Sequence, residues 1–75
     1  VLAKQQRPAT ALDHFAKAVQ LRPDYAEAHF ELGRLLGDQG RLREAALHFS
    51  ETLRIEPNHK QAQKYLELSL RMMQQ

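Results

Sequence analysis

Apolar residues recur at steps of three and four along most of this chain, which is the spacing of one face of an α-helix. The first stripe begins at about Leu12 and predicts a helix over about residues 9–21. Similar stripes predict further helices over about residues 25–39, 41–55 and 59–73. In the last helix the inner side is expected to carry Ala62, Leu66, Leu70 and Met73. The pattern therefore predicts an all-α chain.

Proline, glycine and short polar residues mark the ends of these helices. Pro23 and Pro57 each end a helix, because proline disfavours helical backbone in the residue before it. Asp24 and Asn58 follow the prolines, and we expect their side-chain oxygens to cap the next helices. Gly40 is expected to close the second helix as a C-terminal turn residue. Connections this short predict antiparallel helical hairpins.

The first residues also have a helical character. Residues 1–6 are expected to be the end of a helix that begins earlier, and Pro8 suits the first turn of the following helix. We therefore expect the chain to be a segment of a longer protein.

The chain repeats itself at a fixed period. Pro57 follows Pro23 at the same interval at which Phe49 follows Phe15. The same offset relates Ala11 to Ala45, His14 to His48, Ala28 to Ala62, Leu32 to Leu66 and Leu36 to Leu70. A period within the range of about 20–50 residues is typical of helical units that stack and share a core with their neighbours. Such arrays usually bind other molecules and seldom catalyse reactions.

The repeated residues resemble the signature of the tetratricopeptide repeat family. In the central copy the signature residues are Leu32, Gly33, Leu36, Ala45, Phe49 and Pro57. Partial copies contain Ala11, Phe15, Ala18 and Pro23, and later Ala62, Leu66 and Leu70. The resemblance predicts a partial repeat over 1–25, a complete repeat over 26–59, and a capping helix or the first helix of a further repeat over 60–75.

Some signature positions have a physical reason, and some depart from the family. Gly33 and Ala45 are expected to be small because paired helices approach closely there, while Phe15 and Phe49 are expected to fill the space between helix pairs. The departures are His29 in place of the usual Trp, Leu36 in place of Tyr, Thr52 in place of Ala and Glu67 in place of Gly. Glu67 fits a terminal helix that caps the array.

The resemblance implies antiparallel helical hairpins stacked as a right-handed superhelix, a segment of an α-solenoid. It also implies that the first helix of each pair lines a concave groove that holds a peptide or helical segment of another protein. By matching position, the groove residues of the central repeat are Glu27, Phe30, Glu31, Arg34 and Asp38. Those of the last helix are Gln61, Lys64, Tyr65, Leu68 and Met72. The alternative is that these are ordinary solvated helix faces.

The groove residues also indicate what kind of partner fits. Some family members hold the C-terminal carboxylate of chaperones with a cluster of Lys, Arg and Asn, but here Phe30 and Glu31 stand where that subgroup has Lys and Asn. A groove with Phe30 and Tyr65 beside Glu27, Glu31 and Arg34 better suits a segment with an apolar anchor and some basic residues.

A second apolar stripe on the last helix suggests another use. Tyr65, Leu68 and Met72 lie at helical spacing on a different face from Leu66 and Leu70. We expect such a second apolar face to be covered by a partner, by a second copy of the chain or by further residues of a longer protein. Self-association through this stripe is the second hypothesis.

Composition and motifs exclude several other functions. The chain has 75 residues, no cysteine and a formal net charge of +2, and its apolar runs are too short for a membrane span, so a soluble chain is expected. The absence of cysteine leaves the compartment open. RNA binding is disfavoured because no stripe is formed by Arg34, Arg41, Arg43, Arg54 and Arg71.

No cofactor, metal or catalytic centre is expected. His14 and His48 recur only because of the repeat, which should place each on the outer face of its helix and too far apart to share a metal ion. Ser50 and Ser69 have no glycine-rich elbow that would suit a nucleophile. The sequence therefore predicts a protein-interaction module and not an enzyme.

Overall fold

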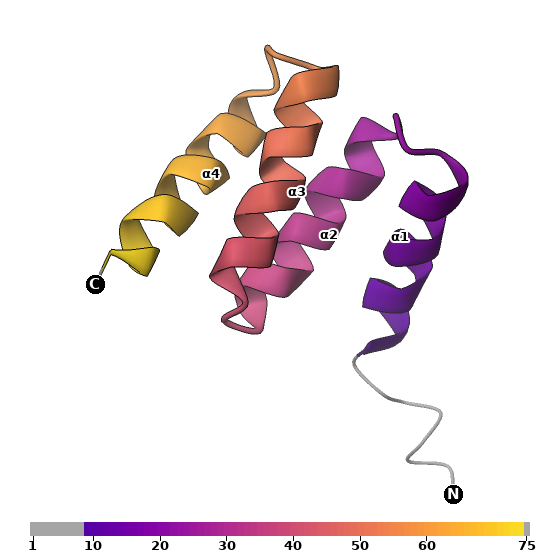
Figure 1. Cartoon of the computed structure of the whole chain (residues 1–75), viewed down its shortest axis with the longest axis horizontal. Coiled ribbons are helices and arrows are strands. Elements are labelled where there is room, and N and C mark those ends of the chain that lie inside the picture. The colour runs from indigo at the N-terminus through magenta and orange to yellow at the C-terminus, as the bar shows by residue number, and fades with distance from the viewer. Residues whose placement is uncertain (1–8, 75) are drawn as a thin grey trace, which may run out of the picture.

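The computed structural model describes residues 9–74, which form a row of helices in chain order, each antiparallel to the one before it (Figure 1). The helices are α1 (Ala9–Leu21), α2 (Ala26–Asp38), α3 (Leu42–Ile55) and α4 (Lys60–Met73). This part of the chain contains no strand, which confirms the predicted all-α fold. The expectations for residues 1–6 and Pro8 lie outside the described residues.

The first proline turn delays the start of α2 by one residue relative to the prediction. The Tyr25 N–H donates to the Arg22 carbonyl at 3.0 Å, so Pro23 and Asp24 occupy the middle of a β-turn. The N-cap is therefore Tyr25, which makes no side-chain capping bond. The prediction that Asp24 caps this helix was wrong, because Asp24 is the third residue of the turn and the N-cap position falls on Tyr25.

The second proline turn has the same form but a different cap. The His59 N–H donates to the Glu56 carbonyl at 3.0 Å, which again places the proline and Asn58 inside the turn. His59 is the N-cap of α4, and its Nδ1 accepts the Ala62 N–H at 3.1 Å. The prediction of Asn58 as the cap was wrong for the same reason as in the first copy.

Gly40 closes α2 as predicted. Its φ of 80° lies in the left-handed region that glycine adopts without strain. The Gly40 N–H donates to the Gly37 carbonyl at 3.0 Å, and the Arg41 N–H donates to the Leu36 carbonyl at 2.9 Å. These two bonds satisfy carbonyls at the end of α2 and turn the chain sharply into α3.

The hydrophobic core lies where α2, α3 and α4 meet. Its fully buried members are Phe30, Leu32, Leu36, Ala45, Phe49 and Ala62. Half-buried residues that pack against it are Leu12, Phe15, Ala16, Val19, Leu53, Tyr65 and Leu66. The core therefore belongs mainly to the complete repeat and to the first turns of α4.

The close approach of α2 and α3 explains the small residues of the signature. A Cβ atom added at Gly33 would lie 2.7 Å from Cε1 of Phe49 and 2.9 Å from its Cδ1, which is closer than carbon atoms can approach. Ala45 is fully buried in the same interface. The predicted packing role of Gly33, Ala45 and Phe49 is confirmed.

The two outer helices are less enclosed than predicted. Ala11 of α1 is exposed, because among the described residues no helix packs on that side of α1. On α4, Leu70 is 45% exposed and Met73 is 39% exposed, so the prediction of these two as inner residues was wrong. Among the described residues no further helix covers the far side of α4, and only Ala62 of the predicted inner set is fully buried.

Candidate partner-binding cleft

A cleft of about 240 Å³ lies between α2 and α4, with α3 at its base. Its walls and base are formed by Arg34, Gly37, Asp38, Leu42, Phe49, Tyr65, Leu68, Ser69 and Met72. α2 and α4 both pack antiparallel to α3 and therefore run parallel to each other, which places these residues together. The cleft brings together Arg34, Asp38 and Tyr65 from the predicted groove, whereas Glu27, Gln61 and Lys64 are exposed residues that do not line it.

Phe30 does not face the cleft, which corrects one predicted groove residue. Its side chain is only 4% exposed. The Phe30 ring centroid lies 4.7 Å from that of His59, 5.8 Å from that of Phe49 and 5.7 Å from that of Tyr65. The first turns of α4 therefore cover this ring, so Phe30 stabilises the core and is not available to a partner.

Tyr65 joins this aromatic cluster to the cleft. Its ring packs against Phe49 with a centroid distance of 5.7 Å and an interplanar angle of 20°. Because Tyr65 is half-buried, one side of its ring contacts the core while another part lines the cleft. The base and one end of the cleft are thus aromatic surfaces held by buried neighbours.

The apolar stripe of α4 lies in the same cleft. Leu68 is 42% exposed and Met72 is 47% exposed, and both line the cleft beyond Tyr65. The predicted groove and the predicted self-association stripe are therefore one surface, because the stripe is the α4 wall of the groove. Sequence analysis did not place Leu42 and Ser69 in this site, although Leu42 follows the helical spacing of the apolar residues Ala45, Ala46 and Phe49.

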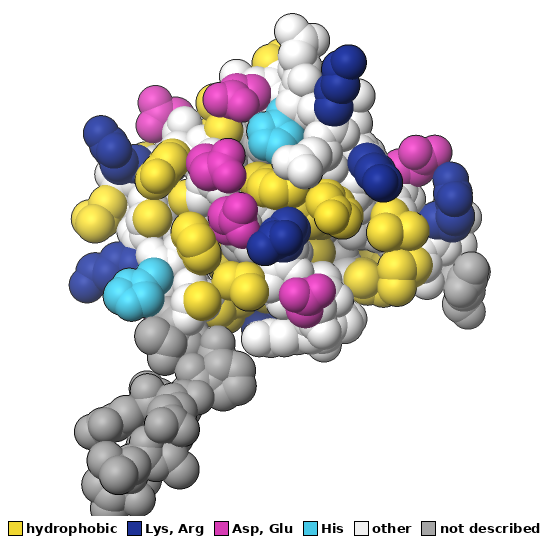
Figure 2. Space-filling view, turned by 180° about the vertical axis from the view of Figure 1, so that it is seen from behind, with side chains coloured by type: hydrophobic (Ala, Val, Ile, Leu, Met, Phe, Trp, Pro, Cys, Tyr) yellow, Lys and Arg dark blue, Asp and Glu magenta, His cyan; other side chains and the backbone are white. Residues whose placement is uncertain are grey.

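The opposite wall of the cleft carries the charges. Arg34 on α2 forms an ion pair with Glu31, with an N–O distance of 3.2 Å, and the two side chains are 48% and 26% exposed. Asp38 lies one turn further along the same wall. Figure 2 shows that yellow hydrophobic side chains and charged side chains of both signs share one face of the molecule. The cleft therefore combines an apolar wall with a charged one.

At equivalent positions of the repeat, α4 carries apolar residues where α2 carries charged ones, and charged or polar residues where α2 packs against α3. At the repeat offset, the groove positions Glu31, Arg34 and Asp38 correspond to Tyr65, Leu68 and Met72. The positions of α2 that contact α3, which are His29, Gly33 and Gly37, correspond to Gln63, Glu67 and Arg71. Arg71 and Glu67 form an exposed ion pair at 3.2 Å. The apolar surface of α4 has thus moved to the cleft side.

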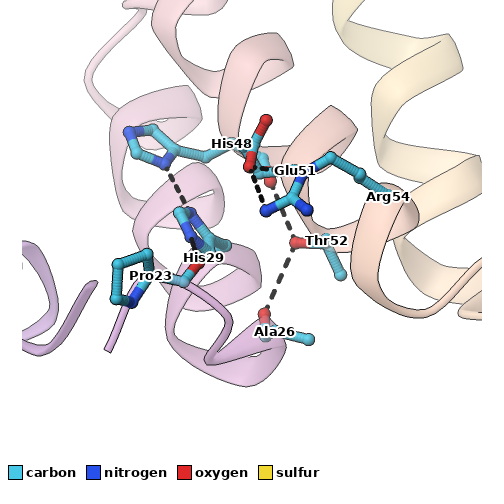
Figure 3. A network of polar contacts seen from close by, with 7 residues as sticks. All are labelled: Pro23, Ala26, His29, His48, Glu51, Thr52 and Arg54. Carbon is cyan, nitrogen blue, oxygen red and sulfur yellow. Dashed lines mark hydrogen bonds and ion pairs between the residues drawn. The ribbon is translucent and has the colours of Figure 1, made fainter. Parts of the chain in front are cut away.

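A separate polar network joins α2 to α3 away from the cleft, and we call it the α2–α3 seam (Figure 3). His29 Nδ1 lies 3.1 Å from His48 Nδ1, and His29 Nε2 lies 2.9 Å from the Pro23 carbonyl oxygen. Thr52 donates its hydroxyl to the His48 carbonyl at 2.9 Å and approaches the Ala26 carbonyl at 3.5 Å. The seam is defined by His29, His48 and Thr52.

The location of His48 corrects the prediction that it lies on an outer face. Its ring is half-buried against His29. Burial of the ring, and then the neighbouring His29, lower the pKa of His48 from its usual value. In residues 9–74 no group of three or more His, Cys, Asp or Glu side chains is arranged to hold a metal ion.

Comparison with known protein families supports the resemblance found in the sequence. A family model described as tetratricopeptide repeat matches residues 2–69. The chain belongs to the tetratricopeptide repeat family. The repeat therefore accounts for nearly all of the sequence, including α4 up to Ser69.

Two plant proteins are similar to the chain. A protein of Petunia hybrida named probable UDP-N-acetylglucosamine–peptide N-acetylglucosaminyltransferase SPINDLY is 36% identical over 69 residues, which are 92% of this chain and 7% of that protein. A protein of the same name from Hordeum vulgare is 35% identical over 69 residues, again 92% of this chain and 7% of that protein. The chain thus spans a small fraction of these relatives' length.

One further property follows from the helix lengths. Among residues 9–74, none of the helices has both the length and the apolar character that a membrane-spanning helix requires.

Proposed function

We propose that the chain is a non-catalytic interaction scaffold that binds a segment of another protein in the cleft between α2 and α4. Membership of the tetratricopeptide repeat family supports a role in protein interaction. The observation that carries the location is the exposure of Leu68 and Met72 on one wall of a preformed cleft, because exposed apolar side chains beside a concavity mark interaction sites.

The size of the cleft indicates what enters it. A volume of about 240 Å³ lies below the roughly 300–1,000 Å³ typical of sites for drug-sized ligands and cofactors. It is suited to one large apolar side chain of a peptide or helix, which would rest on Tyr65 and contact Leu68 and Met72. The partner segment would present a basic residue to Asp38 on the opposite wall.

The arginines favour a protein partner over a nucleic acid. Arg34, Arg41, Arg54 and Arg71 each form an ion pair with a glutamate one helical turn away, at 2.7–3.2 Å. Binding of phosphates would require these pairs to be exchanged.

The proposal is tested with peptides of about twelve residues, selected from a display library for binding to the chain and labelled with a fluorophore. Leu68→Glu is expected to weaken their binding at least tenfold, because it places a charge where the apolar anchor rests. The matched control is Leu47→Glu, at a leucine of α3 that is 63% exposed and outside the cleft. Fluorescence anisotropy measures the dissociation constants.

Two results would decide the question. Peptides that lose affinity for the Leu68 variant and keep it for the Leu47 variant support the cleft. Equal affinity for all three proteins contradicts it. In the supporting case, Asp38→Asn should weaken those peptides that carry a Lys or Arg near the anchor and spare those that do not.

A second candidate function is self-association through the same stripe. It is favoured by the number of exposed apolar side chains on α4, which are Leu68 and Met72 on the cleft side and Leu70 and Met73 outside the cleft. The double variant Leu68→Glu, Met72→Glu is then expected to be a folded monomer under conditions where the unchanged chain is a dimer or larger.

Light scattering across a hundredfold range of concentration measures the mass of both proteins, and circular dichroism shows whether the variant is folded. If the unchanged chain is a monomer throughout, self-association is wrong and the stripe is free for another protein.

A further inference from the structure

The two histidines of the α2–α3 seam form a direct ring-to-ring hydrogen bond. Their Nδ1 atoms are 3.1 Å apart, the ring centroids are 5.3 Å apart, and the ring planes are inclined by 27°. With these distances the two nitrogens lie almost on the line between the ring centres, and therefore close to the planes of both rings. This is the direction in which one imidazole N–H donates to the lone pair of another.

The Pro23 carbonyl fixes which nitrogen of His29 carries the proton. A carbonyl oxygen can only accept, so His29 Nε2, at 2.9 Å, must be the donor. The second copy of the repeat shows the same contact, because Gln63 donates its Nε2 to the Pro57 carbonyl, also at 2.9 Å. Gln63 and Pro57 lie one repeat after His29 and Pro23. The carbonyl at the proline is therefore an acceptor in both copies.

The remaining positions of the protons follow. A neutral His29 with its proton on Nε2 offers Nδ1 only as an acceptor, so His48 Nδ1 must be the donor between the rings. A first additional proton can occupy His48 Nε2 without disturbing this bond. A second one would occupy His29 Nδ1 and place two N–H groups opposite each other. His29 is only 6% exposed, so water does not offer Nδ1 another partner.

We propose that the His29–His48 pair is a proton-sensitive lock across the α2–α3 seam, which holds at most one additional proton while the helices are packed and is released by acid. Through His29 the lock joins the turn after α1, helix α2 and helix α3, which are elements of two successive repeats. It goes beyond the binding of a partner in the cleft and does not depend on it.

The charged groups that face the pair are two glutamates, and each of them is already paired with an arginine. Glu44 and Glu51 of α3 face His48 and act to raise its pKa, in opposition to the burial of the ring. Both are held by arginines of α3 or of the turn before it: Arg41 contacts Glu44 at 2.7 Å, and Arg54 contacts Glu51 at 2.9 Å. The turn after α1 contributes the uncharged Pro23 carbonyl.

The sign of the pH effect follows from counting protons. In the unfolded chain both imidazoles are free and take up protons below about pH 6.5. The packed pair holds one fewer, so the unfolded state binds more protons and stability falls as the pH falls below this value. Above it neither state is protonated at the pair and the full contribution of the lock is present.

The test compares urea unfolding of the unchanged chain and of His29→Gln between pH 7.5 and 5.5. Glutamine is chosen because Gln63 shows that it makes the proline contact in the other copy. The variant lacks the imidazole that the packed pair keeps unprotonated, so the pH dependence that comes from the lock disappears. The unfolding equilibrium constant of the unchanged chain is expected to rise about tenfold more over this range than that of the variant.

Two controls keep the result specific. His14→Gln removes an exposed histidine of α1 and should keep the pH profile of the unchanged chain. The cap formed by His59 is present in all three proteins, so it contributes equally to each of them. Identical profiles for the unchanged chain and His29→Gln would overturn the proposal.

A second measurement does not depend on the variant folding. Nitrogen-15 NMR of the histidine rings in the unchanged chain at pH 7.5 should show His29 protonated on Nε2 and His48 on Nδ1. On acidification His48 should be protonated first while His29 stays neutral. A His29 ring protonated on Nδ1, or simultaneous protonation of both rings without any loss of folded signals, would show that the lock does not exist.

Discussion

Phe49→Ala is expected to lower the free energy of unfolding by about 3–5 kcal/mol, the usual cost of removing a buried phenylalanine from a core. The Phe49 ring is 2% exposed and forms a cluster with the rings of Phe30 and Tyr65, at centroid distances of 5.8 and 5.7 Å. Its loss would open a cavity at the junction of α2, α3 and α4. Since small domains are stable by only about 5–15 kcal/mol, the substitution should remove a large part of the stability of the chain.

Urea titration followed by far-ultraviolet circular dichroism measures this effect. Leu47→Ala is the control on the same helix, because Leu47 is 63% exposed and its truncation should change stability by less than about 0.5 kcal/mol. Similar losses for the two variants would mean that Phe49 is not the centre of the core.

Gly33→Ala and Gly37→Ala are expected to have opposite effects although both glycines lie in α2. An added Cβ at Gly33 meets the Phe49 ring at 2.7 Å, and that ring has no room to retreat from its aromatic neighbours. An added Cβ at Gly37 meets only the Ala45 Cβ at 3.9 Å, an ordinary contact. We expect Gly33→Ala to destabilise by about 1–3 kcal/mol, in spite of the better helix propensity of alanine. Gly37→Ala should stabilise by about 0.5–1 kcal/mol.

The same unfolding experiment decides between these outcomes. A stabilising Gly33→Ala would show that α2 and α3 pack less closely than the structure has them. Combining Gly33→Ala with Phe49→Leu provides a further check. The smaller side chain relieves the contact, so the cost of the double variant should be less than the sum of the single ones.

Helix positions and the repeat could be predicted because they depend on local patterns. The stripes of apolar residues and Gly40 predict where the helices and the turn into α3 lie, and the structure agrees within one or two residues. The caps after Pro23 and Pro57 were predicted one residue too early. The reason is that the proline and the next residue form a closed β-turn, which a search for capping residues alone does not consider.

The site was harder to predict, because burial depends on which helix covers a given face. Phe30 shares a helix face with Glu27 and Arg34, but the first turns of α4 cover it and leave the others exposed. The His29–His48 pair joins residues 19 positions apart, and neither histidine alone indicates the other. One sign of a polar contact was present in the sequence, because His29 departs from the family and places a polar ring where tryptophan is usual.

Each helix of this molecule packs mainly against the helix before it and the helix after it in the chain. Contacts of this kind join residues that are close in sequence, and chains dominated by them fold within microseconds to milliseconds. The turns at Pro23, Gly40 and Pro57 already bring consecutive helices together, so little chain entropy has to be lost before the core forms. Rapid formation of the scaffold is thus a consequence of the same short turns that place α2 beside α4.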